Sequence, residues 1–169
     1  MYDPLAAQDM MTPAPSFSRR NALLGLAAAG LGGSAQAAGL AVTVYKTPYC
    51  GCCTGWVTHM TRAGFRPTVV NVEDLAPIRA KYGVPFELSS CHTGLVGGYV
   101  VEGHVPPSDV LRLLKDRPKA LGIVVPGMPL GSPGMETPRG DAEAYDTLLL
   151  LDRNGRTRVF ARHGRRTPA

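Results

Sequence analysis

The sequence is poor in charged and aromatic residues and begins without an apolar run long enough to cross a bilayer. Charged residues make up 18% of the 169 residues and aromatic residues 7%, a composition that excludes a coiled coil. The apolar stretch near the start, residues 22–31, includes Gly25 and Gly30, whereas a membrane span needs roughly 20 apolar residues. The hydrophobic fraction of 44% is near the globular average and excludes wholesale disorder.

Glycine and proline, in contrast, are abundant. The 20 glycines and 15 prolines predict a globular domain that is rich in loops. The length allows one ordinary domain preceded by an export segment. The sequence contains no internal repeat.

The first residues are typical of an export signal. Arg19 and Arg20 precede an uncharged run over 21–45, which contains a small-x-small cleavage pattern at 35–37. The segment resembles a twin-arginine signal, although Ala22 stands where a bulky apolar residue is usual. We therefore expect residues 1–37 to be removed. Residues 38–169 would then form a mature periplasmic domain without a transmembrane span.

The formal net charge is +5, and the end of the chain is strongly basic. The basic residues after position 152 are Arg153, Arg156, Arg158, Arg162, Arg165 and Arg166. Such a segment can bind nucleic acid, but an exported protein rarely meets any. We interpret it as the solvated edge of a terminal hairpin and expect no nucleic-acid partner.

Hydrophobic periodicity predicts an α/β domain with the element order of a thioredoxin-like fold. Strands are predicted at 41–45 and 67–72, with a helix between them that follows the turn at 47–53 and ends at Gly64. The later predicted elements are a short helix at 75–82, a strand pair at 90–96 and 99–102 turned by Gly97-Gly98, a helix at 107–116, an extended loop at 121–140, and a C-terminal β-hairpin of 145–151 and 157–162.

Three of the four cysteines lie within four residues, Cys50-Gly51-Cys52-Cys53. The stretch has the C-x-x-C spacing of thiol–disulfide enzymes, with a third sulfur inserted. It falls where a strand gives way to a helix, and the unpaired N–H groups and the dipole of a helix N-terminus favour thiolate.

Disulfide geometry leaves more than one pairing open. Adjacent Cys52 and Cys53 have Cα atoms about 3.8 Å apart, below the ~4.4–6.8 Å of a relaxed disulfide. Cys50–Cys53 is a comfortable pair, which leaves Cys52 to pair with Cys91 or to stay free. Two purely structural disulfides, the usual arrangement in an exported protein, would not need three sulfurs crowded into four residues.

This crowding favours a soft metal ion. Structural zinc sites usually space their thiolates by about two to four residues, and adjacent Cys52 and Cys53 would wrap one tetrahedral ion awkwardly. Cu(I) prefers thiolate and thioether ligands and tolerates low coordination numbers, so packed thiolates can bridge several copper ions. Copper is therefore the expected metal, with zinc the less favoured alternative.

Further candidate ligands lie later in the chain. Cys91 and His92 could return a sulfur and an imidazole to the cluster, although an isolated Cys-His pair in a strand is more often a core residue next to a surface one. His104 follows a predicted strand, where functional side chains gather. Met128 and Met135 flank a Pro/Gly-rich stretch that offers little core to fill, which leaves a thioether role as open as a packing role.

Four stretches, 45–53, 90–93, 99–106 and 126–135, together resemble the exported CopG-type copper-resistance proteins. The resemblance covers roughly residues 42–136. It implies a thioredoxin-like fold with a cysteine-bridged, multinuclear copper centre in the periplasm, and redox interconversion of copper as an activity. It also implies the copper ligands, with the cysteines in the first rank: Cys50, Cys52, Cys53, Cys91, His104, Met128 and Met135.

The leading hypothesis is a periplasmic copper-binding protein that sequesters Cu(I) and interconverts it with Cu(II), which as an enzyme would be a copper oxidoreductase. Its expected partners are copper ions and other periplasmic copper-handling or redox proteins. The alternative is a thiol–disulfide oxidoreductase that uses Cys50 and Cys53. Cys52 counts against it, because a third adjacent sulfur would scramble the disulfide. A disulfide-stapled module without chemistry is the third possibility.

Overall fold

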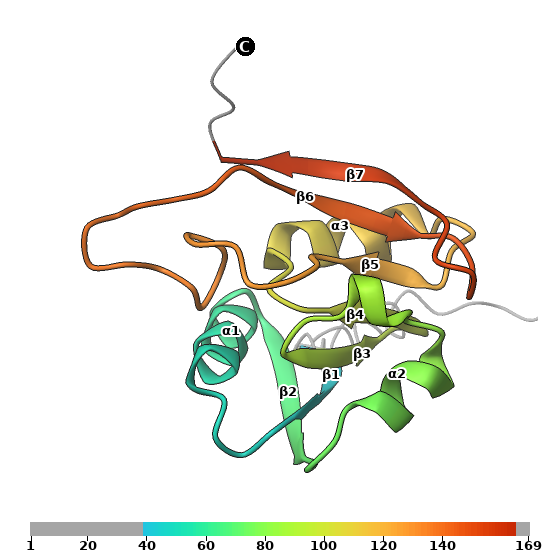
Figure 1. The fold of residues 1–169 in the computed structure, drawn as a ribbon, viewed down its shortest axis with the longest axis horizontal. Coiled ribbons are helices and arrows are strands. Elements are labelled where there is room, and N and C mark those ends of the chain that lie inside the picture. Colours follow the sequence, from blue (N-terminus) through green and yellow to red (C-terminus); the bar gives the residue numbers. More distant parts are fainter. Residues whose placement is uncertain (1–38, 165–169) are drawn as a thin grey trace, which may run out of the picture. The chain divides into compact units, whose positions relative to one another are not determined.

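The computed structural model describes residues 39–164, and the predicted export signal at 1–37 lies outside them. The described residues form a mixed α/β domain with one seven-stranded sheet, ordered β2-β1-β3-β4-β5-β6-β7 (Figure 1). In this part of the chain, no helix combines the length and apolar character that a bilayer span requires. The elements are β1 (Leu40–Lys46), α1 (Gly51–Arg62), β2 (Phe65–Asn71), α2 (Ala76–Tyr82), a 3₁₀ turn η1 (Phe86–Leu88), β3 (His92–Val96), β4 (Tyr99–Glu102), α3 (Pro107–Asp116), β5 (Gly122–Val124), β6 (Tyr145–Leu150) and β7 (Thr157–His163).

The first two strands and α2 agree with the sequence prediction to within two residues, whereas α1 begins at Gly51, inside the turn predicted at 47–53. β1 and β2 are parallel neighbours joined through α1. Trp56 and Met60 lie one helical turn apart and are fully buried, which explains the apolar face of α1. α2 ends at Gly83, whose φ of +79° is a left-handed conformation that glycine adopts without strain.

The centre of the sheet is a hairpin of β3 and β4. The two strands are antiparallel, and β3 also pairs antiparallel with β1. Gly97 and Gly98 form the turn with φ values of +56° and +89°, as a two-residue hairpin loop requires. This part of the prediction is confirmed.

The predicted loop over 121–140 is partly wrong, because it contains β5. This strand pairs parallel with β4 and antiparallel with β6, so it connects the two halves of the sheet. The sequence does not reveal it, because it is only three residues long and starts with a glycine. Gly122 serves close approach between strands, since a Cβ atom there would lie 1.8 Å from the Val100 carbonyl oxygen. Residues 125–144 contain no helix or strand.

The sheet has a core on each face, and neighbouring residues of a strand point to opposite ones. On one face, Val101 of β4 packs in a cluster with residues of α1 and α3, such as Trp56 and Leu113. On the other face, Val100 packs with Val84, which follows α2. The helices α1 and α3 therefore cover one face of β3 and β4, and α2 lies on the other face.

The predicted C-terminal hairpin is confirmed by the antiparallel pairing of β6 and β7. A buried polar cluster ties it to α3. Asp109 Oδ2 accepts hydrogen bonds from Thr147 Oγ1 at 2.7 Å and from His163 Nε2 at 2.8 Å. Since Asp109 and Thr147 are buried, these bonds satisfy groups that water does not reach.

Replacing Gly122 by alanine should destabilise the domain, because the new methyl group would overlap the backbone of β4. Overpacking of this kind costs about 1–3 kcal/mol, to be measured as a loss in the free energy of unfolding in urea. Gly51→Ala is the matched control, since an added Cβ there meets nothing within 4 Å. Equal stability of the two variants would contradict the position assigned to β5.

Candidate metal centre

The first three cysteines lie at the N-terminus of α1. Cys50 is the residue immediately before the helix, and its side chain makes no capping hydrogen bond. Cys53 is fully buried, whereas Cys50 and Cys52 are partly exposed. The first N–H groups of a helix have no intrahelical partner and carry partial positive charge, so this end of α1 stabilises negative charge on sulfur.

Cys50 and Cys53 form a disulfide, with Cα atoms 5.5 Å apart. This is the pairing whose spacing in the sequence suits a relaxed disulfide. Cys52 and Cys91 are free thiols, and Cys52 Sγ lies 3.3 Å from Cys50 Sγ. In this state, two of the four predicted cysteine ligands are bonded to each other, and the disulfide must be reduced before they can act as thiolates.

Cys91 lies beside the other three cysteines despite its distance in sequence. Its Sγ is 3.8 Å from Cys52 Sγ, and its carbonyl oxygen is 3.4 Å from Cys53 Sγ. The four sulfurs all lie within 4.8 Å of one another. We call Cys50, Cys52, Cys53 and Cys91 the cysteine cluster.

The register of the sheet explains this proximity. Lys46, the last residue of β1, is paired with His92, the first residue of β3. The turn that follows β1 and carries Cys50 therefore lies at the same end of the sheet as Cys91, the residue before β3. A shift of one residue in this register would turn every side chain of β3 to the other face.

His104, a predicted ligand, lies beside Cys91. Its Nε2 lies 2.9 Å from Cys91 Sγ, and its Nδ1 lies 2.8 Å from the Pro133 carbonyl oxygen. A carbonyl oxygen can only accept, so Nδ1 carries the proton and Nε2 presents its lone pair to the Cys91 sulfur. Metal-binding histidines are commonly oriented by such a bond from the second ring nitrogen.

His92 is a potential ligand whose imidazole the sequence left open between a place in the cluster and an ordinary core or surface position. Its Nδ1 lies 3.5 Å from Cys91 Sγ, and Cys91, His92 and His104 form a second group within 4.8 Å. The ring packs against Trp56 and His104, with centroids 4.4 and 5.0 Å away. His92 is fully buried, and its Nε2 has no hydrogen-bond partner within the described region. Alternation along a strand suggests that Cys91 and His92 point apart, but β3 begins only at His92.

Burial sets the protonation of these groups. It raises the pKa of the Cys91 thiol to about 12, with a further contribution from neighbouring Cys52. Burial also lowers the pKa of His92 and of His104. Both imidazoles are therefore neutral at neutral pH, which is the form that binds metal. A cation that binds Cys91 has to displace the thiol proton.

The two predicted methionine ligands lie on residues 126–136, which we call the strap. It belongs to the long connection between β5 and β6, which passes α1 (Figure 1). Met128 is 51% exposed, and Met135 is partly buried. The structure thus places both on one segment near the cluster, and their role as ligands stays a prediction.

Two contacts hold the strap against α1, and a third holds it to His104, which follows β4. A Cβ on Gly55 would lie 2.9 Å from Gly134 Cα, so the two backbones touch. Glu136 Oε1 lies 2.6 Å from His59 Nε2 of α1. The third contact is the bond from His104 to the carbonyl of Pro133. The strap therefore covers the first turns of the helix that carries the cysteines.

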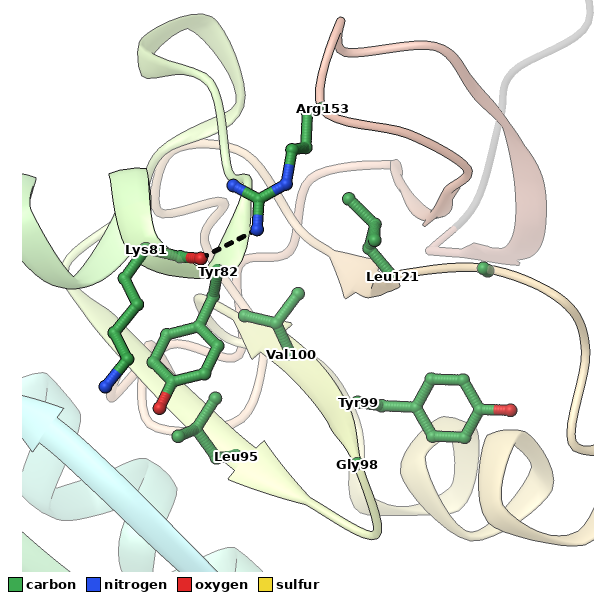
Figure 2. A pocket seen from close by; sticks show the side chains of 9 residues that line it. Lys81, Tyr82, Leu95, Gly98, Tyr99, Val100, Leu121 and Arg153 are labelled. Atoms are coloured by element: carbon green, nitrogen blue, oxygen red, sulfur yellow. Dashed lines mark hydrogen bonds between the residues drawn. The ribbon is translucent and has the colours of Figure 1, made fainter.

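A separate hollow of about 280 Å³ lies on the α2 side of the sheet, and its lining includes Leu95, Val100 and Leu121 (Figure 2). Arg153 reaches over it and donates to the carbonyl oxygens of Ala80 and Lys81 at 3.1 and 2.9 Å. No cysteine or histidine lines this hollow. It is therefore distinct from the cysteine cluster.

Solved structures identify the family. The chain is 41% identical to "Copper resistance protein copG- Form 1" and 40% identical to "Copper resistance protein copG- Form 2", with a TM-score of 0.69 to each. The matches cover 74% and 75% of this chain and 98% and 99% of the two CopG chains. The chain belongs to the CopG family of copper resistance proteins.

A family model described as a protein of unknown function, DUF411, also matches residues 88–135. That range includes Cys91, His92, His104 and both strap methionines, but begins after the C-x-C-C stretch. No curated protein matches the chain. The predicted CopG resemblance is thus confirmed by the solved structures, over nearly their whole length.

Thiol titration tests the cysteine arrangement. Protein isolated without reductant and then unfolded should contain two titratable thiols per chain, because Cys52 and Cys91 are free. Full reduction before unfolding should expose all four cysteines. Cys50→Ala should raise the count without reductant to about three by releasing Cys53. A count of zero in the unreduced wild-type protein would contradict this arrangement and indicate two complete disulfides.

Proposed function

We propose that this CopG-family protein is a periplasmic copper-binding protein of copper resistance that holds Cu(I) in a cysteine-bridged, multinuclear site. The observation that carries the proposal is the gathering of four sulfurs and the His104 Nε2 lone pair at one helix N-terminus. Copper is the cargo of the site, and Met128 and Met135 are its supplementary thioether ligands.

The donor set fits Cu(I) better than zinc. Thiolate, thioether and neutral imidazole are soft or borderline donors, and thiolate and thioether select Cu(I). Cys52 and Cys53 are adjacent, so their sulfurs are better suited to bridge different ions than to surround one tetrahedral ion. His92, whose Nε2 lacks a hydrogen-bond partner among the described residues, adds a further imidazole next to Cys91.

The disulfide supports a redox role for the same site. Oxidation of the Cys50 and Cys53 thiols to the disulfide releases two electrons and two protons. Two Cu(II) ions accept one electron each and become Cu(I). The oxidised protein still offers the Cys52 and Cys91 sulfurs and the His104 imidazole to the Cu(I) formed. A periplasmic dithiol protein would have to reduce the disulfide again, which makes such proteins the expected redox partners.

The arrangement of the first four strands supports a thioredoxin-like fold. The sheet order is β2-β1-β3-β4, with β1 and β2 parallel and β3 antiparallel to both neighbours, and this arrangement is compatible with the element order predicted from sequence. In this interpretation β5, β6 and β7 extend the thioredoxin-like sheet at one edge. The expected twin-arginine signal supports a periplasmic location for the mature domain, residues 38–169.

One specific observation favours a second function, thiol–disulfide exchange. Cys50 and Cys53 have C-x-x-C spacing at a helix N-terminus and are oxidised to a disulfide, as in dithiol oxidoreductases. The nearby Cys52 Sγ weakens this function, because it can attack the Cys50–Cys53 disulfide from within the chain.

Copper titration under anaerobic conditions tests the leading proposal. Fully reduced protein should bind more than one Cu(I) per chain in competition with a chromophoric Cu(I) chelator, because several sulfurs can bridge ions. Cys52→Ser should lower the number of ions bound. Met60→Leu is the matched control, since it removes a sulfur from the buried face of the same helix. One ion or fewer per wild-type chain, or equal binding by Cys52→Ser, would contradict the multinuclear site.

An insulin-reduction assay separates the two functions. The reduced, metal-free protein should not reduce insulin disulfides over repeated turnovers, because Cys52 can attack the Cys50–Cys53 disulfide and scramble it. Multiple turnovers that require Cys53, together with faster turnover in Cys52→Ala, would instead establish the exchange function.

A further inference from the structure

The segment that delivers Cys91 to the cluster has its backbone held by side chains. Residues 89–91 lie between η1 and β3 and belong to neither element. The Ser90 N–H donates to Glu102 Oε1 at 2.8 Å, and the Ser90 carbonyl accepts from the Arg79 guanidinium. In the residue before Cys91, the N–H group is therefore bonded to an acidic side chain and the carbonyl group to a basic one.

Glu102 connects this segment to the sheet. It is the last residue of β4 and is fully buried. Its carboxylate also accepts from Arg79 Nε at 2.8 Å and from Thr93 Oγ1 at 2.6 Å. Arg79 comes from α2, so one pair of charged side chains joins α2, β3, β4 and the segment before Cys91.

Close packing on the other sides prevents Ser90 from moving away. A Cβ on Gly103 would lie 2.6 Å from the Ser90 Cβ atom. Ser90 Oγ donates to the Gly127 carbonyl oxygen, and the Gly127 N–H donates to the Ser89 carbonyl oxygen at 3.2 Å. The backbone next to Cys91 is thus fixed on several sides, and the strap is fixed to it.

We propose that Arg79 and Glu102 are positioning residues that hold Ser90, and through it the sulfur of Cys91, opposite Cys52. Their importance for copper rests on the proposed function, because a preorganised pair of sulfurs loses less freedom when it binds a shared ion. Arginine suits this task because its planar fork donates to Glu102 and to the Ser90 carbonyl at once, whereas lysine offers one compact charged group.

A metal-free measurement tests the positioning directly. In a Cys50→Ala/Cys53→Ala background, Cys52 and Cys91 are the two cysteines left. The protein is then equilibrated with reduced and oxidised glutathione. Cys52 and Cys91 form a disulfide and lose their two protons, while one oxidised glutathione becomes two reduced molecules. The equilibrium constant of this reaction is the effective concentration of the Cys52 thiol at Cys91. Arg79→Lys should lower this effective concentration by about tenfold or more, as loss of outer-shell support does at other sites.

Arg153→Lys is the matched control. Arg153 also donates to two backbone carbonyls at the end of α2, that of Ala80 and that of Lys81. Figure 2 shows the bond to Lys81. The bonds of Arg153 go to α2 and leave Ser90 and Glu102 untouched, so its replacement should keep the effective concentration within about twofold of the parent value. A general loosening of α2 would instead affect both variants equally.

Glu102→Gln provides a second variant in case Arg79→Lys does not fold. The amide keeps the shape and one acceptor oxygen but loses the charge that pairs with Arg79, so it too should lower the effective concentration. Circular dichroism establishes that each measured variant is folded. An unchanged effective concentration in a folded Arg79→Lys or Glu102→Gln variant overturns the inference, as does an equal loss in Arg153→Lys.

A copper measurement separates this inference from the proposed function. With all four cysteines present and reduced, Arg79→Lys should weaken Cu(I) binding by about tenfold in competition with a chromophoric chelator. If the effective concentration falls but wild-type protein binds no Cu(I), the positioning role is supported and the proposed function is overturned. If wild-type protein binds Cu(I) and the effective concentration is unchanged in Arg79→Lys, the proposed function is supported and the positioning role is overturned.

Discussion

The antiparallel register of β1 and β3 is the constraint on which the site depends. Pairing of Lys46 with His92 brings the exit of one strand and the entry of another to the same end of the sheet. The C-x-C-C stretch follows the first strand and Cys91 precedes the second, so the cluster is a product of strand pairing. β1 is hydrogen-bonded to a neighbouring strand on both sides, so the end of the sheet that carries the site is held by strand pairing.

The two faces of the sheet differ in how they surround the site: one buries a neutral histidine, and the other holds an ion pair. His92 and Trp56 lie on the face covered by α1 and α3, and His92 is neutral because burial lowers its pKa by disfavouring the charged form. Glu102 lies on the opposite face, where Arg79 offsets its charge. The sulfur of Cys91 therefore sits between an apolar side that keeps imidazoles unprotonated and an ionic side that holds the backbone.

The sequence predicted the elements whose signals are local. The first strands, α2 with Gly83 at its end, and the Gly97-Gly98 hairpin all follow from periodicity and turn chemistry. β5 could not be predicted in this way, because a strand of three residues is too short to show a hydrophobic alternation. Gly122 is typical of a loop, and only its contact with Val100 in the structure reveals its place in a strand. The pairing of β5 comes from tertiary structure.

The site divides in the same way. The cysteines and His104 could be predicted from residue type and motif, and they do converge. His92 could not be assigned, since its orientation depends on where β3 begins. Arg79 and Glu102 carried no signal at all, because an arginine on an amphipathic helix and a glutamate ending a strand are ordinary until folding places them around Ser90.

Where Gly55 meets Gly134, the strap and α1 contact each other through main chain alone. At this seam the separation of the two segments is set by peptide groups, which have few conformations, and by no rotatable side chain. A single methyl group at either glycine would force the strap and α1 apart, while every donor atom of the site would stay chemically unchanged.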